Sequence, residues 1–174
     1  WTPAVEDVLQ NQPSIQGTLS NDVNGSDDYT VVYQLDIPDG AQYNNDPVPY
    51  SIDSSSTIDF TFDRVAYYLE LEKPNEARTW VFVSFPSITT SVDELGVPTF
   101  NSGIVHNQFL TDVEIQSNHQ NLSSLGVINT GVIEFWGTNY GTTNDLGVPN
   151  GDDSTYDFAD SQWTPDSPGY GSMQ

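Results

Sequence analysis

The chain has 174 residues, with 25 acidic and three basic side chains, and its formal net charge at pH 7 is −22. This charge argues against nucleic acid or an anionic membrane as a partner, because few basic groups are available to meet phosphates. Cys is absent, which excludes disulfides and a catalytic thiol, whereas four Trp, nine Tyr and eight Phe argue against disorder.

The predicted elements are mainly strands. Near the N-terminus, residues 4–10 offer the one plausible helical turn. Later segments are rich in β-branched and aromatic residues, alternate with a period near two and are bounded by turn residues. These predicted strands are residues 29–37, 64–71, 79–85, 111–117 and 131–136, with residues 58–62 as a shorter candidate.

Many strands with long polar loops and few helices predict an all-β fold, specifically an antiparallel jelly-roll-like β-sandwich with long acidic loops. The length suits one domain spanning residues 1–174. Trp80 lies in the middle of a predicted strand, and we expect it to be buried. Residues 94–98 and 145–149 share the motif Leu-Gly-Val-Pro after an acidic residue, which we interpret as two similar loops leaving strands.

The acidic excess is mostly Asp, with 18 of the 25 acids, and it gathers in turns. In the turn at residues 22–28, Asp22, Asn24 and Asp28 place oxygen ligands before a strand, as a Ca²⁺ loop would. The turn lacks the Gly at position six and the Glu at position twelve of an EF-hand, where Tyr33 stands instead. The alternatives are a different type of cation loop and an Asx-rich turn.

A denser acidic segment spans residues 150–160 and contains Asp152, Asp153 and Asp157. Adjacent carboxylates repel one another unless a cation, backbone N–H groups or water compensates, so Ca²⁺ binding and a solvated loop are the two interpretations. A third, weaker group lies within residues 36–46. Because Asp is concentrated in turns rather than on strands, we favour bound Ca²⁺ over an acidic surface that serves only solubility in salt.

Aromatic residues surround the second acidic segment. We assign ligand stacking to four of them, Trp136, Tyr140, Trp163 and Tyr170. Flat aromatic faces beside carboxylate and amide acceptors suit the recognition of sugars. The alternative is that some aromatics in this stretch are core, which we favour for Phe135 and Phe158.

Catalytic signatures are absent from the sequence. His106 and His119 have no third ligand at zinc spacing, and we expect both on the surface or in loops. There is no Gly-x-Ser-x-Gly elbow and no phosphate-binding Gly-rich loop. Paired carboxylates are abundant, so a glycan-active enzyme stays open by residue type alone, but we expect no catalysis.

Several stretches resemble accessory β-domains of large secreted proteins from marine and planctomycete bacteria. The stretches are residues 28–44, 62–71, 131–141, 153–161 and 169–174. The related modules accompany sialate O-acetylesterase-like enzymes and calcium-rich adhesins. The resemblance implies a non-catalytic, secreted or cell-surface module linked to neighbouring domains. The relatives continue beyond the segment matching residues 169–174, so the native chain either extends past Gln174 or ends in a short final strand.

These observations lead to one functional hypothesis and two alternatives. The leading hypothesis is a Ca²⁺-stabilised extracellular module that binds carbohydrate, with no nucleic acid partner and no membrane insertion, because no apolar run reaches the length of a membrane span. The first alternative is a structural or adhesive spacer domain that Ca²⁺ makes rigid. The second is a glycan-active enzyme.

Overall fold

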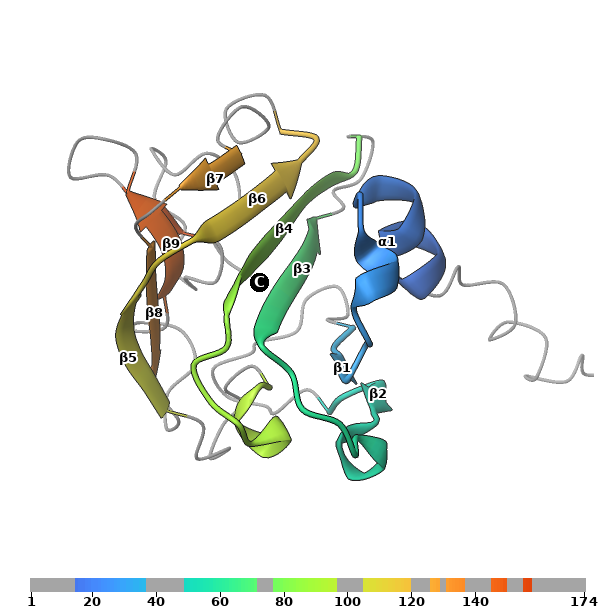
Figure 1. Ribbon diagram of the computed structural model, residues 1–174. Helices are drawn as coiled ribbons and strands as arrows, with labels where there is room; N and C mark the ends of the chain where they lie inside the picture. Colours follow the sequence, from blue (N-terminus) through green and yellow to red (C-terminus); the bar gives the residue numbers. More distant parts are fainter. Residues whose placement is uncertain are drawn as a thin grey trace, which may run out of the picture.

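The structure is a computed structural model, and it describes residues 15–36, 49–71, 77–96, 105–119, 126–128, 131–136, 145–149 and 155–157. The regular secondary structure of these residues is mainly strands in antiparallel sheets, with few helices (Figure 1). The all-β class predicted from the sequence is therefore confirmed.

Two four-stranded sheets dominate the fold. The first sheet has the strand order β3 (Arg64–Leu71), β4 (Thr79–Pro86), β6 (Val113–Ser117) and β7 (Gly126–Ile128). The second sheet has the order β10 (Thr155–Asp157), β9 (Asp145–Pro149), β8 (Gly131–Trp136) and β5 (Val105–Leu110). A separate two-stranded pair joins β1 (Tyr33–Gln34) to β2 (Ile52–Asp53).

The helical elements are short. The α-helix α1 covers Ile15–Asp22, and three single 3₁₀ turns follow it within the described residues. These turns are η2 (Ser26–Asp28), η3 (Ser55–Thr57) and η4 (Val92–Glu94). Gly25, with φ of 79°, lies in the left-handed region between α1 and η2, a conformation that Gly adopts without steric cost.

Strand β4 is buried on both faces. One face of the strand, with Val81, Val83 and Phe85, joins the main core, which also contains Leu110 from β5 and Ile133 from β8. This core therefore connects the two sheets. Other buried and half-buried members of this core come from the first sheet, and they include Val65, Tyr67, Val113 and Ile115.

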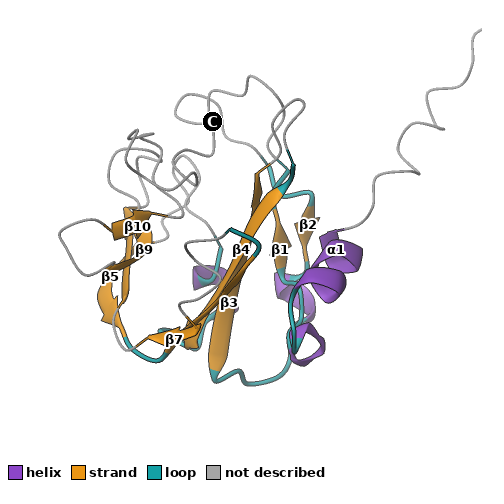
Figure 2. Cartoon of the chain, turned by 90° about the horizontal axis from the view of Figure 1, so that it is seen from above, coloured by secondary structure: helices purple, strands orange, loops and turns teal. Residues whose placement is uncertain are grey.

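A second core cluster covers the opposite face of β4. Trp80 and Phe82 pack there with Leu19 and Val23, which are four residues apart and so share one side of α1 and its C-terminal end. Figures 1 and 2 show α1 and the second sheet on opposite sides of the first sheet. The burial predicted for Trp80 is confirmed.

The chain passes from the second sheet to the first between β5 and β6. Asp112, with φ of 53°, occupies the left-handed region at this corner, which Asp tolerates better than most residues because its short side chain bonds locally. Arg64 on β3 holds the corner, since its Nη1 donates to Asp112 Oδ2 (2.8 Å) and its Nη2 donates to the Asp112 carbonyl (3.0 Å).

Four of the strand predictions agree with the structure. The strands predicted at 64–71 and 131–136 have those bounds, and the one predicted at 79–85 extends by one residue to Pro86. The strand predicted at 111–117 begins at Val113 instead, because Thr111 and Asp112 form the corner between the sheets.

The other element predictions were wrong or incomplete. Within residues 29–36, the described part of the strand predicted at 29–37, only Tyr33–Gln34 pairs as a strand, and residues 58–62 form none. The segment 145–149, interpreted as a loop, is strand β9. Strands β2, β5, β7 and β10 and helix α1 were not predicted. The helical turn predicted at 4–10 lies outside the described residues.

Substituting Phe82 and Phe109 by Ala tests which of the two side chains belongs to the packed core. Phe82 is 2% exposed and Phe109 is 91% exposed. We expect Phe82→Ala to lower the free energy of unfolding by about 3–5 kcal/mol, because it leaves a cavity between β4 and α1. Phe109→Ala should change it by less than about 0.5 kcal/mol. Urea unfolding followed by Trp fluorescence measures both, and equal losses would contradict this packing.

Candidate functional site on the outer face of the second sheet

Strand alternation divides the second sheet into an inner and an outer face. On β5, His106 and Leu110 are buried while Phe109 is 91% exposed. On β8, Ile133 is fully buried in the main core. Because successive residues of a strand lie on opposite faces, Phe109 is on the outer face, away from the first sheet.

The strand register extends this outer face across all four strands. Phe109 pairs with Val132, which pairs with Gly147, which pairs with Asp157. The next outer row toward the other end consists of Asn107, Glu134 and Asp145, and the row beyond it of Val105 and Trp136. We call these three rows the outer face of the second sheet.

This face brings together two of the predicted site residues. Trp136, predicted to stack on a ligand, and Asp157, predicted as a metal ligand, occupy the same face although they belong to different strands. Phe109 joins them from β5. A single exposed apolar side chain is ordinary in a folded protein, so the point of interest is that two aromatic positions share a face with carboxylate positions.

The charged residues on the strands of the second sheet are all acidic. Glu134 and Asp145 are direct register partners in the antiparallel pair of β8 and β9. The residues of β5, β8, β9 and β10 include neither Lys nor Arg. No neutralising positive charge therefore comes from these four strands.

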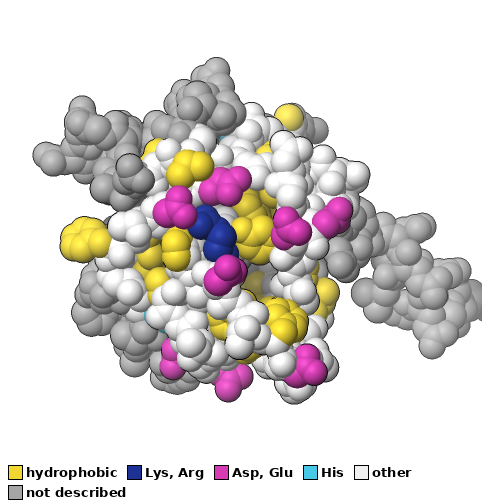
Figure 3. All heavy atoms as spheres, viewed as in Figure 1, with side chains coloured by type: hydrophobic (Ala, Val, Ile, Leu, Met, Phe, Trp, Pro, Cys, Tyr) yellow, Lys and Arg dark blue, Asp and Glu magenta, His cyan; other side chains and the backbone are white. Residues whose placement is uncertain are grey.

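The two Arg residues of the described ranges are engaged elsewhere. Arg64 binds Asp112 at the corner, and its Nε donates to the buried Ser84 hydroxyl, which also lies 2.5 Å from the Tyr29 hydroxyl. Figure 3 shows dark blue side chains bordered by magenta carboxylates on the face viewed in Figure 1.

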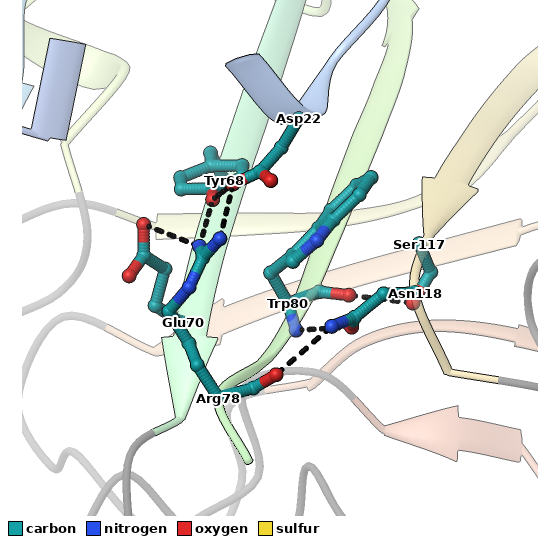
Figure 4. Close-up of polar contacts among 7 residues, drawn as sticks. All are labelled: Asp22, Tyr68, Glu70, Arg78, Trp80, Ser117 and Asn118. Atoms are coloured by element: carbon teal, nitrogen blue, oxygen red, sulfur yellow. Dashed lines mark hydrogen bonds and ion pairs between the residues drawn. The ribbon is translucent and has the colours of Figure 1, made fainter. Parts of the chain in front are cut away.

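Arg78, which precedes β4, is the centre of a polar cluster between α1 and the first sheet (Figure 4). Its Nη2 lies 2.7 Å from Asp22 Oδ2, and its Nη1 lies 3.2 Å from Glu70 Oε1. The same Nη1 donates to the Tyr68 hydroxyl at 2.9 Å, and that hydroxyl donates to Asp22 Oδ2 at 2.8 Å. One guanidinium therefore links the end of α1 to β3.

The environment keeps this cluster in one protonation state. Burial raises the pKa of Tyr68 well above its usual value, and Asp22 and Glu70 raise it further, so the phenol stays protonated and donates to Asp22. Burial by itself lowers the pKa of Arg78, but its bonds to Asp22 and Tyr68 outweigh this and raise the pKa, so the guanidinium stays charged.

A neighbouring pair of bonds fixes the start of β4. Asn118 Oδ1 accepts from the Trp80 backbone N–H at 2.8 Å, and Asn118 Nδ2 donates to the Arg78 carbonyl at 2.9 Å. Ser117 donates from its hydroxyl to the Trp80 carbonyl at 2.5 Å. The end of β6 thus holds the backbone that carries Arg78 and Trp80.

The structure separates the residues predicted for the first cation turn. Asp22 is bound by Arg78 and Tyr68. The backbone N–H and carbonyl of Asn24 are bonded to the Gln116 side-chain amide at 2.9 and 3.0 Å. Asp28 is exposed on η2. Among the described residues, no group of three or more His, Cys, Asp or Glu side chains could hold a metal ion.

The remaining predicted site residues lie outside the described residues. They are Tyr140, Trp163, Tyr170, Asp152 and Asp153. In the ranges that the structure does describe, no helix has the length and apolarity needed to cross a bilayer.

One prediction about the histidines was wrong. His106 is not a surface or loop residue but a buried member of β5, and its Nε2 lies 2.7 Å from the Glu94 carbonyl. His119 is half-buried beyond the end of β6. The error follows from β5 itself, because the polar residues of Val105–Leu110 hide its strand alternation.

Two important residues were missed at the sequence level. No local signal identifies Phe109, since its exposure depends on the pairing of β5 with β8. A signal for Arg78 did exist. In a chain with three basic residues among 25 acids, an Arg beside a strand is expected to meet several carboxylates.

The Arg78 cluster yields a stability prediction. Arg78→Met removes the charge between Asp22 and Glu70, whose side chains are only 16% and 18% exposed. We expect a loss of about 2–3 kcal/mol in the free energy of unfolding, somewhat below the cost of breaking a fully buried pair. Arg78→Lys should lose less, because it keeps the charge. Urea unfolding measures both variants, and a Met variant as stable as the parent would contradict the cluster's role.

We compared the chain with known protein families, curated proteins and solved structures. A scan against protein-family models found no match, and searches of curated proteins and of solved structures found none either.

Proposed function

We propose that this chain is a non-catalytic, Ca²⁺-stabilised extracellular module that binds carbohydrate on the outer face of its second sheet. The observation that carries the proposal is that the positions of Phe109 and Trp136 lie on one face of the sheet. The register of β5 and β8 puts them in the first and the last of its three rows. The proposal includes a jelly-roll-like β-sandwich that belongs to a larger secreted or cell-surface bacterial protein.

The composition of the outer face favours a sugar ligand. The Phe109 and Trp136 rows are four residues apart along β5, which corresponds to about 13 Å along a strand. Between them lies the polar row of Asn107, Glu134 and Asp145. Aromatic positions separated by hydroxyl-accepting positions on a flat sheet suit an extended chain of sugar rings.

Access also favours this face over the equivalent face of the first sheet. There, Trp80 and Phe82 are covered by Leu19 and Val23. On the second sheet, the 91% exposure of Phe109 leaves an aromatic side chain open to solvent. In the described part of the molecule, the second sheet is therefore the better surface for an extended ligand.

The role of Ca²⁺ follows from the charge balance. Arg64 and Arg78 are both used in internal ion pairs, so a bound external cation would relieve the repulsion among exposed carboxylates such as Asp28, Asp53 and Asp59. Because Asp22 is shared by Arg78 and Tyr68, we assign the principal cation site to Asp152, Asp153 and Asp157, with Asn24 and Asp28 as a secondary one.

The cation requirement is tested by thermal unfolding. Chelation should lower the melting temperature by roughly 5–10 °C, and Ca²⁺ in about hundredfold excess over its Kd should restore it. The control is NaCl at matched ionic strength, which screens charge without occupying a site. Full recovery in NaCl alone would replace specific binding with simple screening. Asp152→Asn with Asp153→Asn should blunt the response to Ca²⁺, and Asp59→Asn should not.

The ligand is tested on a glycan array with Ca²⁺ present. We expect Phe109→Ala and Trp136→Ala each to reduce the signal of the bound glycan by about three- to tenfold, through loss of ring stacking. Val127→Ala, on an exposed residue of the first sheet, is the matched control and should bind normally. A silent array, together with a normal response to Ca²⁺, would favour the spacer domain instead.

A further inference from the structure

We propose that Asn24 and Gly25, in the turn that follows α1, form a self-modification site at which Asn24 converts to isoaspartate, and that Gln116 on β6 sets the rate of this conversion. The inference goes beyond the proposed function and shares no residue with the glycan surface. It is carried by two free reacting groups in the turn and by a bidentate contact between Gln116 and the Asn24 backbone.

The reaction joins groups of two neighbouring residues and uses only water as a co-reactant. The backbone nitrogen of Gly25 attacks the side-chain carbonyl carbon of Asn24, so that a C–N bond forms and the bond to the side-chain nitrogen breaks. That nitrogen leaves as ammonia, with the proton of the Gly25 N–H delivered through solvent. Water then opens the cyclic imide at either carbonyl, which yields aspartate or isoaspartate. Gly at the second position favours the attack, because it has no Cβ to hinder the approach.

The folded turn leaves both reacting groups unengaged. Asn24 is exposed. Among the described residues, neither its side-chain amide nor the Gly25 N–H makes a hydrogen bond. Gly25 has a φ of 79°, and a Cβ built on it would meet no atom within 4 Å. The space around the attacking nitrogen is therefore open.

Gln116 restrains the backbone of Asn24. Its Oε1 accepts from the Asn24 N–H at 2.9 Å, and its Nε2 donates to the Asn24 carbonyl at 3.0 Å. Ring closure sets the angle about the bond between Cα and the carbonyl carbon of Asn24, and the carbonyl oxygen turns with that bond. A carbonyl held by Gln116 therefore limits ring closure, and the reaction proceeds mainly when this contact opens locally.

The product disturbs the packing of α1. Isoaspartate inserts an extra carbon into the main chain between Val23 and Ser26, which are 3% and 7% exposed. The carbonyl group that Gln116 holds becomes part of a new carboxylate, so one of the two bonds to the turn is altered. Val23 belongs to the cluster that covers Trp80 and Phe82. The conversion is thus a one-way change that loosens α1 from the first sheet.

The test is incubation of the full chain in mildly alkaline buffer, followed by proteolysis and mass spectrometry of the peptide that contains Asn24. Deamidation raises the mass of this peptide by about 1 Da. The incubation omits Ca²⁺, because Asn24 belongs to the proposed secondary cation site. We expect the folded parent to convert at least about tenfold more slowly than the chain in urea, and Gln116→Ala to convert about three- to tenfold faster than the folded parent.

Two variants serve as controls. Gln34→Ala is the same change on β1, where Gln34 bonds to Asp36, and it should convert as the parent does. Val65→Ala removes part of a buried side chain of the main core, so it lowers the global stability without touching the turn. It should also stay near the parent rate, which separates the local contact from stability.

Three results would overturn the inference. The first is a folded parent that shows no mass change at Asn24 while the chain in urea converts, since the fold would then block the site. The second is a parent that converts as fast folded as in urea. The third is Gln116→Ala converting at the parent rate, or no faster than Val65→Ala, which would remove the role of Gln116. The isoaspartate form, separated by ion exchange, should melt roughly 3–6 °C below the parent, and equal melting would contradict the loosening of α1.

Discussion

The burial of strand β4 on both faces is the constraint on which the rest of the structure depends. One face of β4 packs against the second sheet through Val81, Val83 and Phe85. The other face packs against α1 through Trp80 and Phe82. Each fully buried side chain of this size contributes about 1.5–3 kcal/mol. A strand with two apolar faces must be covered twice, so the first sheet becomes the middle layer among the described elements.

This layering determines where polar and charged groups can lie. The polar bonds at the two ends of β4 are made by Arg64, Arg78 and Asn118, which hold the corner at Asp112, the end of α1 and the end of β6. Both arginines of the described residues are therefore engaged in ion pairs inside the fold. The cover of α1 over the first sheet is one reason why we propose the outer face of the second sheet as the binding surface.

Sequence patterns were most reliable where a strand is apolar and central. The segments at 64–71 and 131–136 carry enough Val, Leu, Ile and aromatic residues to be recognised alone. Strand β5 could not be found this way, because its His, Asn and Gln residues interrupt the apolar alternation. It is a strand because it pairs with β8, which lies far from it in sequence. Helix α1 was missed for a related reason, since it contains Gly17 and depends on the packing of Leu19 and Val23 rather than on helix propensity.

The sequence by itself determined the all-β class, the acidic excess and the supply of aromatic and carboxylate residues, because these depend on composition and on a period of two along the chain. Only the tertiary structure decided that Asp22 belongs to Arg78, that His106 is buried, and that Phe109, Trp136 and Asp157 share one face. The physical reason is that faces and ion pairs are set by register and packing between strands distant in sequence. No local pattern encodes which strand becomes the neighbour of another.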